Sequence, residues 1–130
     1  MRRSEILSLN WENISFENKI ATLEFTKNGS SRMVPLSSLA LAVLINQRQE
    51  RMPIPFPIND NTFRLAWDRL RNRAGITDLR FHDLRHEAIS RFFEKGLSIA
   101  EVAAISGHKD PRMLFRYTHL DAKIIANKLN

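Results

Sequence analysis

The sequence predicts an α+β fold that is mainly helical, with a small three-stranded antiparallel sheet near the N-terminus. Residues 11–36 consist of short runs rich in β-branched and aromatic residues, and turn residues separate these runs. From residue 37 onward, apolar residues recur at helical spacing between capping residues and glycines. A chain of 130 residues is long enough to bury a core of its own, so we expect one domain.

The chain opens with a short helix, which the pattern places between Arg2 and Leu9. Ile6 and Leu9 are at helical spacing, and Glu5 lies one turn from Arg2. Three strands should follow, at residues 11–16, 19–26 and 32–36. Lys27 then falls at the tip of the second turn, where a side chain is free to reach a substrate.

Two longer helices are expected in the middle of the chain. The first runs over residues 37–52, with Ser37 or Ser38 as its N-cap, and three prolines make residues 52–58 an extended connector. The second has Asp60 or Asn61 as its N-cap and continues to Ala74, where Gly75 ends it.

The second of these helices has an apolar stripe formed by Phe63, Trp67 and Leu70. Three arginines are candidate DNA-binding residues: Arg64, Arg71 and Arg73. Their face is either a solvated basic surface or one that lies along DNA phosphates.

The C-terminal part should contain four shorter helices. The first spans residues 81–95 and stops at Gly96, and the next opens at Ser98 and ends at Gly107. Asp110 followed by proline predicts a short helix that carries Tyr117. A last helix should be capped by Asp121.

Groups suited to attack on a phosphate gather in this C-terminal part. His82 and Arg85 are three residues apart, so on a helix an imidazole and a guanidinium share one face and can converge on an anion. A Gly107-His108 step follows, and Tyr117 is the only tyrosine of the chain.

The order of these residues resembles the phage integrase family, also called the tyrosine recombinases. The resemblance extends over nearly the whole chain. It rests on the boxes Met1 to Leu7, Thr26 to Gly29 with Arg32 to Leu36, His82 to His86, Gly107-His108 and Arg116 to His119. It maps the family's catalytic residues onto Arg2, Lys27, His82, Arg85, His108 and Tyr117.

The resemblance implies a catalytic domain that cuts and rejoins DNA strands through a 3′-phosphotyrosyl intermediate. Arg2, Arg85 and His108 would stabilise charge on the phosphate. The base that removes the tyrosine proton would be His82, and the acid that protonates the leaving oxygen would be Lys27. The groups that orient these residues would be Glu5 and His119. No cofactor is expected, because the phosphodiester energy is conserved in the tyrosyl bond.

The family pattern also leads us to expect a partial domain over residues 1–130. The upstream helices and the DNA-clamping domain that the family usually carries do not match any part of the sequence. We therefore expect weak cleavage by this chain alone, and self-association on DNA through the C-terminal helix.

Composition favours a polyanionic partner. The net charge is +6 and the pI is near 10.3, which is typical of proteins that bind double-stranded DNA. There is no cysteine, and no apolar stretch is as long as a membrane span. We therefore expect a cytoplasmic protein that does not bind membranes.

Three other interpretations remain open at the level of sequence. His82, His86, His108 and His119 could bind a metal, although the carboxylates and cysteines of a dedicated site are missing. Residues 98–108 with 111–117 could form a helix-turn-helix that binds DNA without catalysis. The chain could also be an inactive integrase remnant that keeps the motifs.

Overall fold

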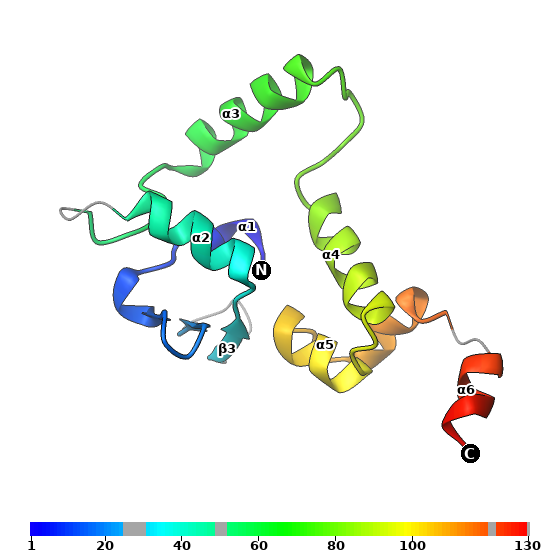
Figure 1. Ribbon diagram of the computed structural model, residues 1–130. Coiled ribbons are helices and arrows are strands. Elements are labelled where there is room, and N and C mark those ends of the chain that lie inside the picture. Colours follow the sequence, from blue (N-terminus) through cyan, green and yellow to red (C-terminus); the bar gives the residue numbers. More distant parts are fainter. Residues whose placement is uncertain (25–30, 49–51, 120–121, 130) are drawn as a thin grey trace.

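The computed structural model describes residues 1–24, 31–48, 52–119 and 122–129. In the first half of the chain, a three-stranded sheet follows a first helix and precedes a second one in the sequence (Figure 1). The elements of this half are α1 (Arg3–Leu7), a 3-10 turn η1 (Trp11–Asn13), β1 (Ile14–Ser15), β2 (Ile20–Leu23), β3 (Arg32–Pro35) and α2 (Ser38–Gln47). The strands are antiparallel in the order β1-β2-β3, as the sequence predicts.

The sheet buries one face against the first core cluster. Along β2, Ala21 and Leu23 are buried while their neighbours are half-buried, which is the alternation expected of a strand with one covered face. Val34 of β3 pairs with Ala21 and joins the same cluster. Leu9 and Leu44 bring the end of α1 and the middle of α2 onto it.

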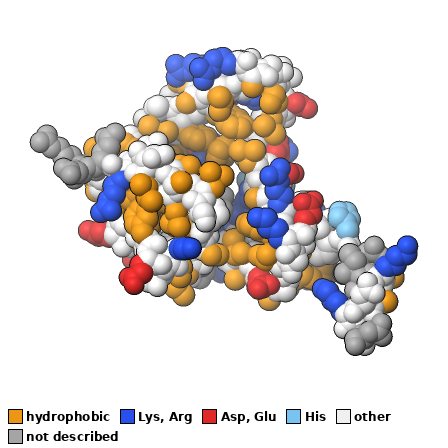
Figure 2. Space-filling view, viewed as in Figure 1, with side chains coloured by type: hydrophobic (Ala, Val, Ile, Leu, Met, Phe, Trp, Pro, Cys, Tyr) orange, Lys and Arg blue, Asp and Glu red, His pale blue; other side chains and the backbone are white. Residues whose placement is uncertain are grey.

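A long helix, α3 (Asp60–Arg73), extends away from both halves of the molecule (Figure 1). None of its described side chains is buried. Its contacts with the rest of the chain include Phe63 and Trp67, whose rings meet Phe81 edge-on at 4.7 Å and 5.3 Å between centroids. Asp60 at its start also forms an ion pair with Arg3 of α1 at 2.7 Å. In Figure 2, hydrophobic side chains gather on the edge of α3 that faces α2 and α4, and basic side chains lie on its opposite edge.

The second half of the chain packs around its own core cluster. Its elements are α4 (Asp83–Glu94), α5 (Ile99–Ser106) and a 3-10 helix η2 (Pro111–Tyr117). Ile89, Val102 and Leu114 supply one fully covered side chain from each. The last helix, α6 (Ala122–Lys128), lies at the end of the chain away from this core (Figure 1).

Capping residues predict most of the helix starts. Ser37 and Ser98 cap α2 and α5 as expected, and Gly107 ends α5 in the left-handed conformation. The cap of α3 was predicted one or two residues too late, because the Asn59 side chain accepts a hydrogen bond from the Thr62 N–H at 2.8 Å. The expected cap Asp121 and the expected hairpin residue Lys27 lie outside the described residues.

Several element boundaries differ from the prediction. The first strand is shorter, because the Asn10 side chain accepts from the Glu12 N–H and folds residues 11–13 into a turn. The helix that was expected to reach residue 52 ends at Gln47. Residue 83 rather than 81 begins α4, since the Asp83 carboxylate accepts from the Arg80 N–H at 2.9 Å. In the described ranges, no helix is both long and apolar enough to cross a membrane.

Candidate active site

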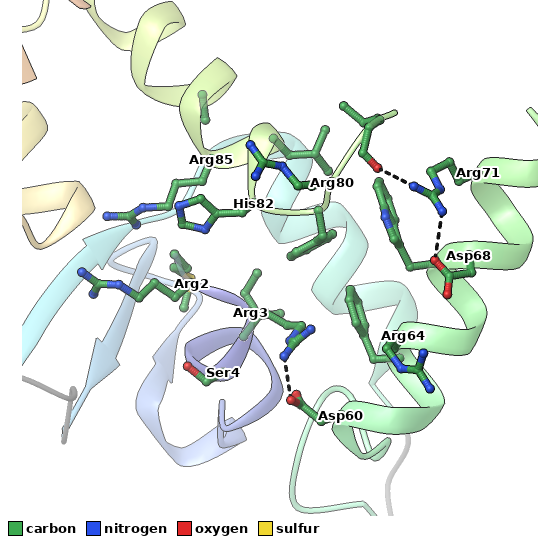
Figure 3. Close-up of a pocket in the computed structure, with 18 residues that line it drawn as sticks. Arg2, Arg3, Ser4, Asp60, Arg64, Asp68, Arg71, Arg80, His82 and Arg85 are labelled. Atoms are coloured by element: carbon green, nitrogen blue, oxygen red, sulfur yellow. Dashed lines mark hydrogen bonds and ion pairs between the residues drawn. The ribbon is translucent and has the colours of Figure 1, made fainter. Parts of the chain in front are cut away.

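The N-terminus of α1 and the first turn of α4 both line one cleft. The cleft has a volume of about 760 Å³ and lies between α1, α3 and α4. Arg2, His82 and Arg85 line it together, and Figure 3 shows their side chains extending toward the same side. His82 precedes α4 as its N-cap but keeps helical backbone angles, so the predicted shared face with Arg85 is formed.

A buried carboxylate holds Arg2 in place. Glu5 accepts hydrogen bonds from the main-chain N–H of Arg2 at 2.6 Å and from its guanidinium at 3.1 Å. Arg32 of β3 binds the same carboxylate with two parallel hydrogen bonds at 2.9 Å and 2.8 Å. Burial alone would raise the pKa of Glu5, but the bonds from Arg32 and Arg2 outweigh it and lower the pKa to about 2.

The Arg32 guanidinium also passes against Gly107. Gly107 has a φ of 75°, and a β-carbon there would lie 2.7 Å from Arg32 Cζ. Glycine is therefore required both by the backbone conformation and by the close contact. Arg32 thus connects the sheet, the α1 residue Glu5 and the turn that carries His108.

Ser106 contacts two of the predicted catalytic residues. Its main-chain carbonyl accepts a hydrogen bond from Arg85 Nη2 at 2.7 Å, and its hydroxyl is hydrogen-bonded to His108 Nδ1 at 2.6 Å. Arg85 Nη1 is buried and has no acceptor among the described residues. The turn after α5 therefore orients Arg85 and His108 together and leaves one guanidinium nitrogen available for a ligand.

Tyr117 is fixed on η2, as the sequence predicts, and Leu114 anchors that helix in the second core. A hydrogen bond joins its hydroxyl to Nδ1 of His86, and the two rings are within 21° of parallel with 6.0 Å between centroids. The ring of His82, the predicted base, instead meets the His86 ring edge-on at 4.9 Å. The tyrosine thus lies in the site of its own chain, next to His86.

The site is rich in positive charge. Burial lowers the pKa of Arg85, and the charge of Arg2 lowers it further. Burial also lowers the pKa of His82 and of His108, and the nearby arginines add to both shifts. These histidines are therefore neutral near pH 7, and the arrangement of cations favours an anionic ligand.

Of the other sequence-predicted residues, His119 lies away from this cluster and Lys27 lies outside the described residues. Glu5, predicted to orient the catalytic residues, is hydrogen-bonded to Arg2, whereas His119 is exposed beyond the end of η2. Within residues 1–24, 31–48, 52–119 and 122–129, no three side chains of the metal-binding types gather at one place.

The three candidate DNA-binding arginines of α3 differ in their surroundings. Arg64 is exposed and bonds to the nearby Asn61 side chain at 3.1 Å, and Arg73 is also exposed. The guanidinium of Arg71 instead donates to the Thr77 carbonyl at 2.8 Å. It also forms an ion pair with Asp68, which Figure 3 shows together with its contact to the Leu79 carbonyl. Arg71 therefore fixes the connector that follows α3.

Three residues of the site were missed by sequence reasoning: Arg32, Ser106 and the tyrosine partner His86. Arg32 shares a sheet face with buried Val34, so a basic residue at a core-facing strand position was the available signal. His86 follows His82 by one helical turn, and the sequence pattern suggests it only as a metal ligand. Nothing in the local sequence distinguishes Ser106.

The comparisons with known proteins agree with this geometry. The family model of the phage integrase family matches residues 1–123. A shufflon-specific DNA recombinase of Escherichia coli is 48% identical over 136 residues, which cover 100% of this chain and 34% of the relative. The integrase of Salmonella phage P22 is 30% identical over 139 residues, covering 92% of this chain and 36% of the phage protein.

Solved structures show the same fold. The catalytic domain of bacteriophage HP1 integrase superposes with a TM-score of 0.74 at 25% identity, covering 99% of this chain and 73% of that one. The recombinase XerH, bound to its difH substrate, gives a TM-score of 0.74 at 20% identity, with 99% and 42% covered. The chain spans about a third of the length of the curated relatives described above.

The resemblance drawn from the sequence motifs is therefore confirmed by an independent family match over residues 1–123 and by the shared fold. This chain belongs to the phage integrase family, the tyrosine recombinases.

Proposed function

We propose that this chain is the catalytic domain of a site-specific DNA recombinase, which cuts and rejoins strands through a 3′-phosphotyrosyl bond. One observation carries the proposal: the Tyr117 hydroxyl, Arg85 and His108 come together in a single chain around Arg2. Family membership supplies the reaction class, and the cluster supplies its groups.

The cations would bind the scissile phosphate. Two guanidinium groups suit the non-bridging oxygens, because each can donate two parallel hydrogen bonds to them. Arg85 has a donor, Nη1, with no acceptor among the described residues, and a phosphate oxygen would satisfy it. His108, held by Ser106, would donate to the charge that develops in the transition state.

The reaction exchanges one phosphodiester for another. The Tyr117 oxygen forms a bond to phosphorus as the bond from phosphorus to the 5′-oxygen breaks, so no nucleotide is consumed. Tyrosine is mostly protonated near pH 7, so a base must take its proton, and the family resemblance nominates His82. The 5′-oxygen needs a proton in turn, and we propose Lys27 as the donor.

Double-stranded DNA is the proposed substrate. The net charge of +6 and the exposed arginines of α3 supply an attractive surface for phosphates. Solved relatives of the same fold include a transposon integrase in complex with transposon end DNA. We place the duplex along the cleft between α1, α3 and α4, so that the phosphate meets Arg2 and Arg85.

Self-association through α6 belongs to the same proposal. Ile125 and Leu129 are exposed on and just after this helix, with 43% and 82% of their surface accessible. A second copy bound on DNA would cover these side chains. Truncation before residue 122 should then lower the mass of the DNA-bound assembly measured by light scattering.

The test of the central proposal is covalent capture of DNA. Nicked duplexes of random sequence are incubated with the full-length protein, and DNA linked to protein is recovered by phenol extraction and sequenced. We expect adducts enriched in one sequence for the wild type, and no adduct for Tyr117→Phe. A non-enzymatic helix-turn-helix module would bind the library and give no adduct. That result, or an adduct that persists in Tyr117→Phe, would overturn the proposal.

A further inference from the structure

We infer that His86, rather than His82, takes the proton from Tyr117 during attack on the phosphate. The inference rests on the proposed function and names a catalytic group for it. The direct observation is the hydrogen bond between the Tyr117 hydroxyl and His86 Nδ1 within one chain. A general base must lie within hydrogen-bond reach of the proton that it abstracts, and His86 meets this condition.

The contact is built into the fold. His86 is half-buried on α4, whose Ile89 is in the second core, and Tyr117 packs against the same core from η2. Leu114, one turn before Tyr117, is fully covered in that core. The two partners are therefore positioned by the same packed cluster, and neither lies on a free loop.

The surrounding charges favour transfer from oxygen to nitrogen once a phosphate is bound. The groups that surround the pair are His82 and Arg85 on α4, Arg116 over the tyrosine ring at 5.5 Å, and His108 after α5. Arg85 and a Tyr117 phenolate attract each other. The positive charges of the arginines attract a phenolate but repel an imidazolium at His86. The negative charge of an incoming phosphate offsets this repulsion.

The step balances without a further reactant. In the tautomer that carries hydrogen on Nε2, His86 accepts the Tyr117 O–H proton at Nδ1, and the ring becomes an imidazolium. The phenolate oxygen bonds to phosphorus, and the 5′-oxygen leaves with a proton from the acid. In the return step, a 5′-hydroxyl attacks the phosphotyrosine and gives its proton to the deprotonated acid, while His86 gives its proton back to the departing phenolate.

His82 then contacts the phosphate rather than the tyrosine. It lines the cleft with Arg2 and Arg85 and is exposed, so it faces the position of the phosphate rather than the tyrosine. Its ring reaches the site through an edge contact with His86. A neutral imidazole at this position can donate a hydrogen bond to a phosphate oxygen.

The first test needs no DNA. Long-range proton–nitrogen correlation spectra of the histidine rings reveal which nitrogen carries hydrogen in the neutral form. We expect His86 to be the Nε2–H tautomer, with an Nδ1 resonance that moves when Tyr117 is replaced by Phe. A hydrogen on Nδ1 of neutral His86, donated to the tyrosine oxygen, would overturn the inference whatever the protein does to DNA.

The second test uses the nicked duplex selected by covalent capture. His86→Gln keeps a hydrogen-bond acceptor but cannot accept a proton, and we expect it to slow adduct formation by about 100-fold, the scale of a lost general base. A substrate with sulfur at the 5′-bridging position has a leaving group that needs no acid. It can therefore rescue a variant that lacks the acid, and it should not rescue His86→Gln, which lacks the base. Glu87→Gln is the matched control, since Glu87 is exposed on α4 and bonds to Arg91.

Each outcome bears on a separate claim. Wild-type protein that gives no adduct contradicts the proposed function. Wild-type adducts together with His86→Gln adducts at a rate within threefold of wild type contradict only the role of His86. Rescue of His86→Gln by the sulfur substrate would make His86 the acid and would also contradict it. If circular dichroism shows that His86→Gln does not fold, the tautomer of His86 in the wild-type protein decides whether His86 can be the base.

Discussion

Arg32 and Gly107 are in contact across the boundary between the two halves of the chain. A β-carbon on residue 107 would meet Arg32 Cζ at 2.7 Å, a separation that folded proteins essentially never show. The same guanidinium makes two hydrogen bonds to Glu5, so it has little freedom to withdraw. The position of His108 relative to Arg2 therefore depends on a side chain that the reaction does not use.

Gly107→Ala should lower stability more than the same change at Gly96. Both glycines have positive φ, but nothing lies within 4 Å of a β-carbon at Gly96. Positive φ alone costs roughly 1 kcal/mol for alanine, and the Arg32 contact should add to this at residue 107. Urea unfolding of both variants measures the difference. Equal destabilisation of the two variants, or no relief of the Gly107→Ala effect by Arg32→Ala, would contradict the contact.

The ion pair of Glu5 predicts a specific acid sensitivity. Its folded pKa of about 2 lies below the ordinary value of 4.5, so its contribution is fully present above that ordinary value. The contribution, roughly 3 kcal/mol from the shift, is lost as pH falls from about 5 toward 2. Urea unfolding at several pH values should therefore show a steeper acid decline for wild type than for Glu5→Gln. Parallel curves would mean that Glu5 is not strongly paired.

Ser106→Ala should impair His108 without disturbing Arg85. The variant removes the hydroxyl bonded to His108 Nδ1 and keeps the carbonyl that accepts from Arg85. We expect adduct formation to slow by about 10-fold with DNA affinity unchanged, because one orienting hydrogen bond is removed. Ser98→Ala is the control: it removes the cap of the same helix and should lower stability by about 1 kcal/mol without slowing cleavage of the folded protein.

The arginines of α3 should separate into two kinds when DNA binding is measured against salt. Arg64 and Arg73 are exposed, so replacing both with Gln should reduce the log-log slope by about 0.9 for each phosphate that is no longer neutralised. Arg71→Gln should leave the slope nearly unchanged and lower the unfolding midpoint, since its guanidinium bonds to Thr77 and Asp68. A slope reduced by Arg71→Gln alone would place that side chain on DNA instead.

Local signals account for the parts of the fold that the sequence predicts well. Ser37, Ser98 and Gly107 act within one turn of their own positions, and each caps or ends the helix expected of it. The errors occur where two local signals compete, as at Asn59, which precedes two other capping residue types. Propensity does not decide between neighbouring caps, whereas the hydrogen bond to Thr62 does.

The sequence also predicts only some of the residues of the candidate site. Motif spacing identifies Arg2, Arg85 and Tyr117 because their chemistry fits an ordered set of boxes. Arg32 and His86 act through residues that are 27 and 31 positions away in the chain. Such contacts depend on how the two halves dock, and a single sequence contains no direct signal of that docking.

The two core clusters have no buried residue in common among the described residues, and the proposed reacting groups are divided between the two halves. Arg2 belongs to the half built on the sheet, whereas Arg85, His108 and Tyr117 belong to the half built on α4, α5 and η2. Ile105 of α5, which packs against the first cluster, and the Arg32–Gly107 contact together join the two halves. A small rotation about this joint would separate Arg2 from Arg85 while both cores stayed closed. The DNA cutting proposed for this chain would then stop through a hinge movement that requires no unfolding.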